Sequence, residues 1–294
     1  MNRKQFLGLL SLTPILYAMR TVNELFNYKD ILPNTVKMPV LFLGHGSPMN
    51  AIEENEFVTG FRNIAKTIPT PTAILCISAH WFTKGTKVTE MKMPQTIHDF
   101  GGFPKELFDV QYPAKGSPEL AQLTKELILP TEVELNHDWG LDHGGWSVIK
   151  HLYPEANIPV IQMSIDYSLT GQAHFDMAQK LQSLRNKGIL IIGSGNIVHN
   201  LRMVDWANFD KDNYGFDWAI EAREKINKNI IDGDFANLIN YQKQGKAFDL
   251  AIPTPDHYLP LLYTLGLKNE SENIQLFNDK LLAGSLSMTS VKIG

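Results

Sequence analysis

Cysteine is nearly absent from this sequence. The 294 residues include a single one, Cys76, so the chain can build neither a disulfide framework nor a zinc site of several thiolates. Cys76 lies inside an apolar run, where a lone cysteine usually serves as a small core side chain. Any metal bound by this protein must therefore be held mainly by nitrogen and oxygen atoms.

The net charge is small, and the sequence has no long apolar run. The formal net charge of −4 gives no electrostatic footprint for nucleic acid. The mostly apolar stretch at residues 6–19 is too short to span a bilayer comfortably, so no stable membrane span is expected. No internal repeat or low-complexity tract interrupts the chain. These observations favour one domain over residues 38–294.

The N-terminus needs a separate interpretation. A polar, basic start at residues 1–5 precedes the apolar stretch, as at the beginning of a secretory signal. Residues 3–7 (Arg-Lys-Gln-Phe-Leu) resemble a twin-arginine export signal with Lys4 in place of the second arginine. An N-terminal helix that stays in place and packs on the domain is the alternative. We assign residues 1–37 as a leader or export signal followed by an irregular segment, and a functional signal would place the protein in the periplasm.

Three short apolar runs are each followed by a histidine. The runs are Val40–Leu43, Ala73–Ser78 and Ile189–Ile192, and the histidines are His45, His80 and His199. Such runs are typical of strands buried on both faces, as in a parallel sheet covered by helices. Ligands gather at the carboxyl ends of these strands. We therefore predict an α/β fold with a central, largely parallel sheet, and a metal site at its carboxyl edge.

The remaining segments supply the rest of the predicted fold. Apolar spacing and capping residues predict helices at residues 53–68, 117–127, 169–185, 217–231 and 234–244, and strands at 159–165 and 286–291. The segment between Thr83 and Gly116 is long and rich in glycine, proline and aromatic residues. Long loops in compact domains are usually functional. We expect this segment to form a wall or lid over the site, with room for a short strand.

Two more histidines have a distinctive setting. His143 lies in a glycine-rich stretch, and His257 follows Thr254 and Pro255, which suit the cap and first position of a helix. His257 would then occupy the first turn of a helix that ends at Gly266. Of the other histidines, His98 is a candidate to line the lid, and His137 is expected in a loop. His151 and His174 lie in predicted helices and are expected to be surface or structural residues.

The five selected histidines favour metal chemistry. Three neutral imidazoles make a good site for zinc or iron with open coordination positions. Asp142 and Asp256 each adjoin a histidine and are candidates for ligands, for orienting groups, or for a turn and a helix start. Ser47 and Ser194 do not fit the Gly-x-Ser-x-Gly elbow, which disfavours serine hydrolysis.

Five motifs occur in a characteristic order along the chain. They are Gly44-His45-Gly46-Ser47-Pro48, Ser78-Ala79-His80-Trp81, Gly140-Leu141-Asp142-His143-Gly144, Gly193-Ser194-Gly195-Asn196-Ile197-Val198-His199-Asn200 and Pro253-Thr254-Pro255-Asp256-His257. In this set the sequence resembles the class III extradiol ring-cleavage dioxygenases, specifically the 4,5-DOPA extradiol dioxygenase branch. The resemblance extends from Pro39 to the C-terminus and does not include the leader.

The resemblance implies a role for each histidine. His45, His80 and His257 match metal ligands, and His257 stands where the wider class carries a carboxylate. His199 matches an acid/base catalyst or a further metal neighbour, and His143 matches a histidine that holds a substrate oxygen. One mononuclear divalent metal is implied, with Fe(II) for turnover and Zn(II) also suited to three histidines. The implied partners are a small catecholic, DOPA-like substrate and O2, and the implied location is cytoplasmic.

Two alternatives stay open from the residues alone. A zinc-dependent hydrolase or amidase could use a metal-bound hydroxide on the same three histidines, and would consume no O2. A non-catalytic relative would bind metal tightly without turnover. The sequence gives no indication of the oligomeric state.

Overall fold

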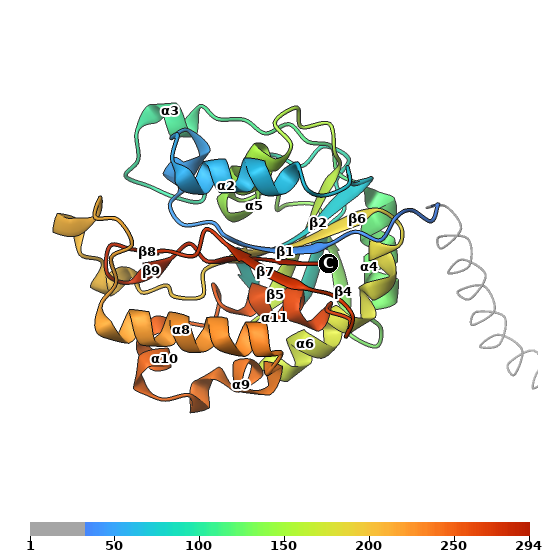
Figure 1. Cartoon of the computed structure of the whole chain (residues 1–294). Coiled ribbons are helices and arrows are strands. Elements are labelled where there is room, and N and C mark those ends of the chain that lie inside the picture. The colour runs from blue at the N-terminus through green and yellow to red at the C-terminus, as the bar shows by residue number, and fades with distance from the viewer. Residues whose placement is uncertain (1–32) are drawn as a thin grey trace, which may run out of the picture.

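The computed structural model describes residues 33–294. The predicted leader falls largely on residues 1–32, which lie outside the described part. An eight-stranded sheet, with the order β4-β3-β5-β2-β6-β1-β10-β7, is covered by helices on both faces (Figure 1). The predicted α/β architecture is therefore confirmed. Within residues 33–294, no helix is long and apolar enough to cross a membrane.

The centre of the sheet is parallel, as predicted. It consists of β1 (Val40–Gly44), β2 (Ala73–Thr83), β5 (Val160–Asp166) and β6 (Ile189–Gly195). Successive side chains point to opposite faces. In β2, Leu75 and Ile77 enter the core on one face, whereas Ile74 and Cys76 enter the core on the other. Burial on both faces explains why these strands read as continuous apolar runs.

Shorter strands complete the sheet on both sides. They are β3 (Thr86–Thr89), β4 (Val133–Asn136), β7 (Ile274–Phe277) and β10 (Ser290–Ile293), and a separate pair is formed by β8 (Leu281–Leu282) and β9 (Leu286–Ser287). β10 runs antiparallel to β1 and β7, so the sheet is mixed at this side. β3 is the short strand expected inside the 83–116 segment.

The helices form two layers (Figure 1). One layer contains α2 (Glu56–Ala65), α3 (Lys105–Phe108) and α5 (His143–Leu152), with the 3₁₀ turn η1 (Pro48–Ala51). The other contains α4 (Pro118–Leu127), α6 (Gly171–Lys180), α7 (Gln182–Arg185), α8 (Asp217–Asp232), α9 (Phe235–Ile239), α10 (Lys246–Ala251) and α11 (Leu259–Gly266). The remaining 3₁₀ turns are η2 (Leu201–Met203), η3 (Trp206–Asn208) and η4 (Tyr241–Lys243).

Several local predictions were wrong. The helix expected at residues 234–244 ends at Ile239 and is followed by η4, and the strand expected at residues 286–291 is divided into β9 and β10. The helix expected at residues 169–185 is divided into α6 and α7. His80 lies within β2, not beyond it, because the strand continues through a register shift between Ile77 and Phe82. The helix expected from Pro255 begins only at Leu259.

The late start of α11 has a physical cause. The carbonyl of His257 accepts a hydrogen bond from the Asn196 N–H at 2.9 Å, so it is engaged by the end of β6. His257 is therefore held in the turn that precedes the helix.

Candidate metal centre

The site lies at the carboxyl ends of the central parallel strands, as predicted. His45 follows β1, and its N–H donates to the Gly195 carbonyl at 3.1 Å. His80 is supplied by the last part of β2, and His257 by the turn before α11. A Cβ on Gly195 would lie 2.1 Å from the His257 carbonyl oxygen, so only glycine lets this turn approach β6 so closely. The fold thus brings together residues that are more than 200 positions apart.

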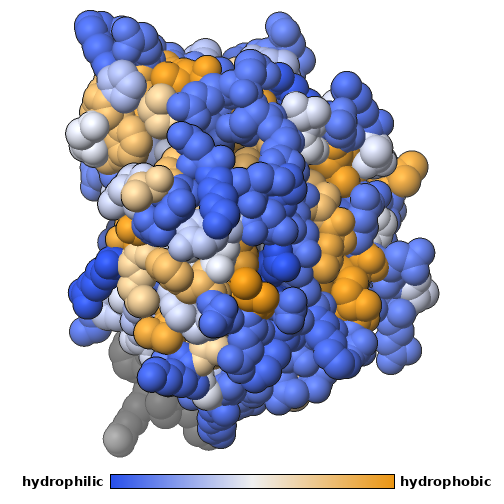
Figure 2. Space-filling view, turned by 60° about the vertical axis from the view of Figure 1, so that its left-hand side comes forward, coloured by the Kyte–Doolittle hydropathy of each residue, from blue (hydrophilic) through white to orange (hydrophobic). Residues whose placement is uncertain are grey.

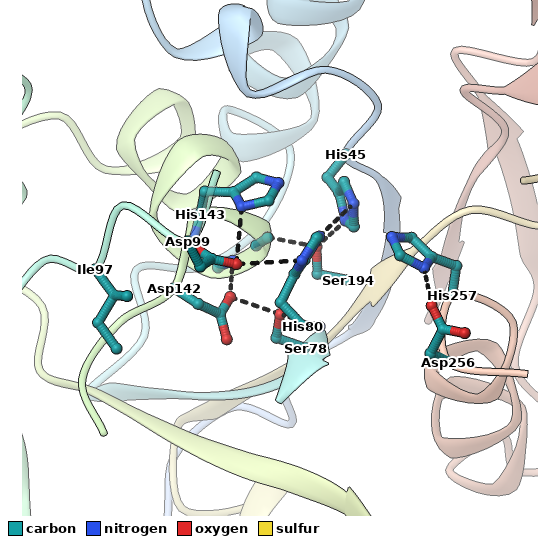
Figure 3. Close-up of polar contacts among 12 residues, drawn as sticks. His45, Ser78, His80, Ile97, Asp99, Asp142, His143, Ser194, Asp256 and His257 are labelled. Carbon is teal, nitrogen blue, oxygen red and sulfur yellow. Dashed lines mark hydrogen bonds and ion pairs between the residues drawn. The ribbon is translucent and has the colours of Figure 1, made fainter. Parts of the chain in front are cut away.

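Three imidazoles point toward one another in this region (Figure 3). The Nε2 atoms of His45 and His80 are 3.2 Å apart. One ring nitrogen from each of His45, His80 and His257 lies within 4.8 Å of the others. His45 and His257 are buried, and His80 is partly buried. The spacing allows one metal ion to contact all three rings.

The outward nitrogen of each ring faces an oxygen atom. His45 Nδ1 lies 3.0 Å from Ser194 Oγ, and that hydroxyl donates its proton to the Gly144 carbonyl. His80 Nδ1 lies 3.2 Å from a carboxylate oxygen of Asp99. The Nδ1 of His257 hydrogen-bonds to the adjacent carboxylate of Asp256.

These contacts determine which nitrogen can bind a metal. An oxygen that can only accept at this position requires the proton on Nδ1, which leaves a lone pair on Nε2. All three rings are set in this way, and metal-binding histidines commonly use such an outer partner. The donor set therefore fits a divalent metal with three neutral imidazole ligands.

Electrostatics keep two of the three rings neutral. Burial, followed by the repulsion of neighbouring imidazoles, lowers the pKa of His45 well below its ordinary value. Burial also lowers the pKa of His257, although Asp256 partly opposes this shift. For His80, burial acts in the same direction, but the carboxylates around it outweigh burial and raise its pKa.

His143 is the first residue of α5. The Asp142 carboxylate caps this helix through the Gly145 N–H at 3.1 Å, and it also accepts from Ser78 Oγ at 2.6 Å. This helix was not predicted from the sequence, because it contains Gly144 and Gly145 and glycine disfavours helices. A Cβ on Gly144 would lie 2.7 Å from His80 Cδ2. Glycine therefore lets α5 begin directly against His80, and the two imidazole centroids are 3.9 Å apart.

His199 occupies a different position from the other predicted ligands. Its ring stacks on that of His257, with centroids 3.6 Å apart and planes inclined by 10°. Its nitrogen groups with Asp256 and His257, outside the cluster of three nitrogens described above. Burial, with the proximity of His257, lowers the pKa of His199 to about 2. Within residues 33–294, no group hydrogen-bonds to this imidazole.

Asp99 is a residue of the site that the sequence did not reveal. Its Oδ1 accepts from the His143 N–H at 2.9 Å. Its Oδ2 lies 3.0 Å from His143 Nδ1 and 3.2 Å from His80 Nδ1. Burial raises the pKa of this carboxyl, but its contacts with His143 and His80 outweigh that effect and hold the pKa well below its usual range. The only signal was its place in the aromatic, glycine-rich part of the 83–116 segment.

The same segment forms one wall of the site, as predicted. The Phe100 ring packs edge-on against His143, with centroids 5.4 Å apart. It also contacts Phe103 and Phe108. His98 holds the segment in place through the Val110 carbonyl at 2.9 Å from its Nε2.

A second segment leaves the site directly after His199. Leu201 and Trp206 are 61% and 73% exposed, and Trp206 stacks on Phe209. Figure 2 turns the left-hand side of Figure 1, where the carboxyl ends of the parallel strands lie, toward the viewer. Hydrophobic residues form separate groups on this face, between predominantly hydrophilic surfaces.

Comparison with known proteins agrees with this geometry. Residues 39–287 match the family of the catalytic LigB subunit of aromatic ring-opening dioxygenase. The chain belongs to this family. As a LigB-family dioxygenase, it uses a small aromatic substrate and O2. The predicted resemblance is confirmed.

Several LigB-family relatives resemble it over most of their length. The 4,5-DOPA dioxygenase extradiol of Escherichia coli (strain K12) is 47% identical over 270 residues, which are 90% of this chain and 98% of that protein. The Beta vulgaris protein of the same name is 33% identical, over 85% of this chain and 94% of that protein. A crystal structure of an uncharacterized protein from Escherichia coli K12 superimposes with a TM-score of 0.76 at 43% identity, and covers 88% of this chain and 100% of that one.

Proposed function

We propose that this protein cleaves a catecholic, DOPA-like ring beside its diol, using O2 and a single Fe(II) held by His45, His80 and His257. The convergence of one ring nitrogen from each of these histidines, with an oxygen beside the Nδ1 of each ring, is the observation that carries this proposal. The substrate class is supported by the names of relatives, which are called 4,5-DOPA dioxygenase extradiol.

The donor set explains the choice of substrate. Bound Fe(II) would supply the acidification of the catechol hydroxyls and the electron exchange with O2. Three neutral imidazoles leave the full charge of a divalent ion uncompensated. The attraction of that charge for a doubly deprotonated catechol is large in a partly buried site.

The residues around the metal centre are candidates for proton transfer and for substrate binding. His199 is our candidate for the group that takes a phenolic proton, because its ring is neutral and is engaged by stacking alone. His143 lies on the other side, against His80, where it can hold a substrate oxygen. Phe100 supplies an apolar surface beside His143 and excludes water from it.

An oxygen-electrode experiment tests the proposal. The metal-free protein is loaded anaerobically with Fe(II), and DOPA is added with O2. We expect O2 uptake, with the formation of a yellow, ring-opened product. Protein loaded with Zn(II) and the His45→Ala variant serve as controls and should consume no O2. Absence of uptake by the iron-loaded protein, together with hydrolysis of an ester or amide by the zinc-loaded protein, would contradict the proposal.

A further inference from the structure

We propose that Asp99 is a positioning residue that sets the orientation and the tautomer of two site imidazoles at once, those of His80 and His143. The inference rests on the proposed metal centre, although it does not depend on which substrate is used. Asp99 belongs to the wall segment, yet its side chain is turned inward and is only 17% exposed (Figure 3).

Three nitrogen atoms surround this carboxylate. Oδ1 accepts from the backbone N–H of His143 at 2.9 Å. Oδ2 lies 3.0 Å from His143 Nδ1 and 3.2 Å from His80 Nδ1. The two oxygens therefore lie beside one backbone N–H and two imidazole nitrogens, and an ionised carboxylate is the side chain that can accept from all three and donates to none.

The consequence for each imidazole is specific. With the proton on Nδ1, His80 presents the lone pair of Nε2 toward His45 Nε2, as a metal ligand requires. His143 likewise presents Nε2 as an acceptor. A substrate hydroxyl that reaches His143 can then donate a hydrogen bond to that nitrogen before the catechol is deprotonated.

Replacement by asparagine would break this arrangement in a defined way. An amide has one oxygen and one NH2 group. In one orientation the NH2 faces the two Nδ1 atoms and favours the wrong tautomer of both rings. In the other orientation the NH2 group faces the His143 backbone N–H, so two hydrogen-bond donors point at each other. Neither orientation serves all three contacts.

The test uses metal binding in the absence of any catechol. Zn(II) affinity is measured by competition with a chromophoric chelator, and the Co(II)-loaded protein is examined by its visible spectrum. We expect Asp99→Asn to bind Zn(II) about 10- to 100-fold more weakly, as is typical when the outer partner of a ligand is lost. The Co(II) spectrum should change, and Asp99→Glu should recover part of the affinity.

Asp109→Asn is the matched control. It lies in the same segment, but its carboxylate is 59% exposed and pairs with Lys105 at the surface. This variant should bind both metals like the wild-type protein. Wild-type affinity and an unchanged Co(II) spectrum in a folded Asp99→Asn variant would overturn the inference.

A second measurement uses the wild-type protein, so it tests the inference even if the Asp99→Asn variant fails to fold. Long-range ¹⁵N–¹H correlation spectra of the wild-type protein, labelled at histidine and free of metal, report which ring nitrogen carries the proton. We expect the Nδ1–H tautomer for His143, and a proton on Nε2 of that neutral ring would overturn the inference. Failure of the wild-type protein to bind Zn(II) would count against the proposed metal centre, and these spectra would then decide the role of Asp99.

Discussion

The histidines on the two sides of the metal centre have different contacts. On the wall side, one carboxylate, from Asp99, contacts the imidazoles of both His80 and His143. On the opposite side, Asp256 contacts His257 at its Nδ1, while His199 stacks on that ring.

This difference suggests how one cluster of histidines can both position the metal and substrate and transfer protons. A carboxylate beside Nδ1 fixes the proton there and reserves Nε2 for one task. The His199 imidazole, which is engaged by stacking, stays neutral and has no carboxylate that fixes its tautomer. We therefore expect the wall side to position metal and substrate, and His199 to transfer protons.

The largest effect should come from removing a ligand on either side. His80→Ala and His257→Ala should both lose tightly bound metal and all turnover, because two imidazoles and open solvent make a weak site. Metal content after gel filtration checks this expectation. The control is His137→Ala, since that ring is 64% exposed at the surface. Retention of metal at wild-type affinity by either ligand variant would remove that residue from the site.

His199→Gln should separate catalysis from metal binding. Loss of a general acid or base typically costs about 10²–10⁴ in rate, so we expect kcat to fall within that range. Metal content should stay unchanged, because the His199 nitrogen lies outside the cluster of three. Steady-state O2 uptake and metal analysis on the same sample provide the measurement. Full activity, or loss of the metal, would contradict the division between the two sides.

Asp256→Asn should have a smaller effect on metal affinity than Asp99→Asn. Asp256 contacts a single imidazole of the site, and an asparagine oxygen can still accept the proton on His257 Nδ1. We expect Zn(II) affinity to fall about 10-fold, at the lower end of the range for outer partners. The two variants should be compared in one chelator competition. An equal or larger loss for Asp256→Asn would contradict the asymmetry between the sides.

Ser194→Ala should give the smallest effect. Its hydroxyl is a neutral partner of His45, and a neutral hydrogen bond typically contributes about 0.5–1.5 kcal/mol. Zn(II) affinity should therefore fall roughly 2- to 13-fold on the same scale. Thermal unfolding provides the control for the lost bond to the Gly144 carbonyl. A loss as large as that of Asp99→Asn would show that carboxylates have no special role here.

The sequence was sufficient to predict the central sheet and the convergence of histidines at its carboxyl edge. His45 and His80 are found at or near the ends of apolar strands, and parallel strands place their carboxyl ends together. His257 was correctly predicted to lie near the start of a helix. It was wrongly placed inside that helix, because α11 begins at Leu259. The hydrogen bond between its carbonyl and Asn196 depends on a distant strand, which no local pattern reports.

The parts that escaped prediction share a physical reason. Asp99 lies in a loop, so it has no periodicity, and its importance arises only where α5 and β2 meet it in space. The start of α5 was hidden by two glycines, which are there to make room for His80. The strands β4 and β7 have four residues each and are partly exposed, so their apolar alternation is too short to recognise.

X-ray absorption spectroscopy of the zinc-loaded protein tests the central claim most directly. The arrangement of His45, His80 and His257 predicts three imidazole ligands at about 2.0–2.1 Å, with the remaining coordination supplied by water. A fourth imidazole would add His199 or His143 to the ligands and remove the division between the two sides. Two or fewer imidazoles would contradict the three-histidine centre itself.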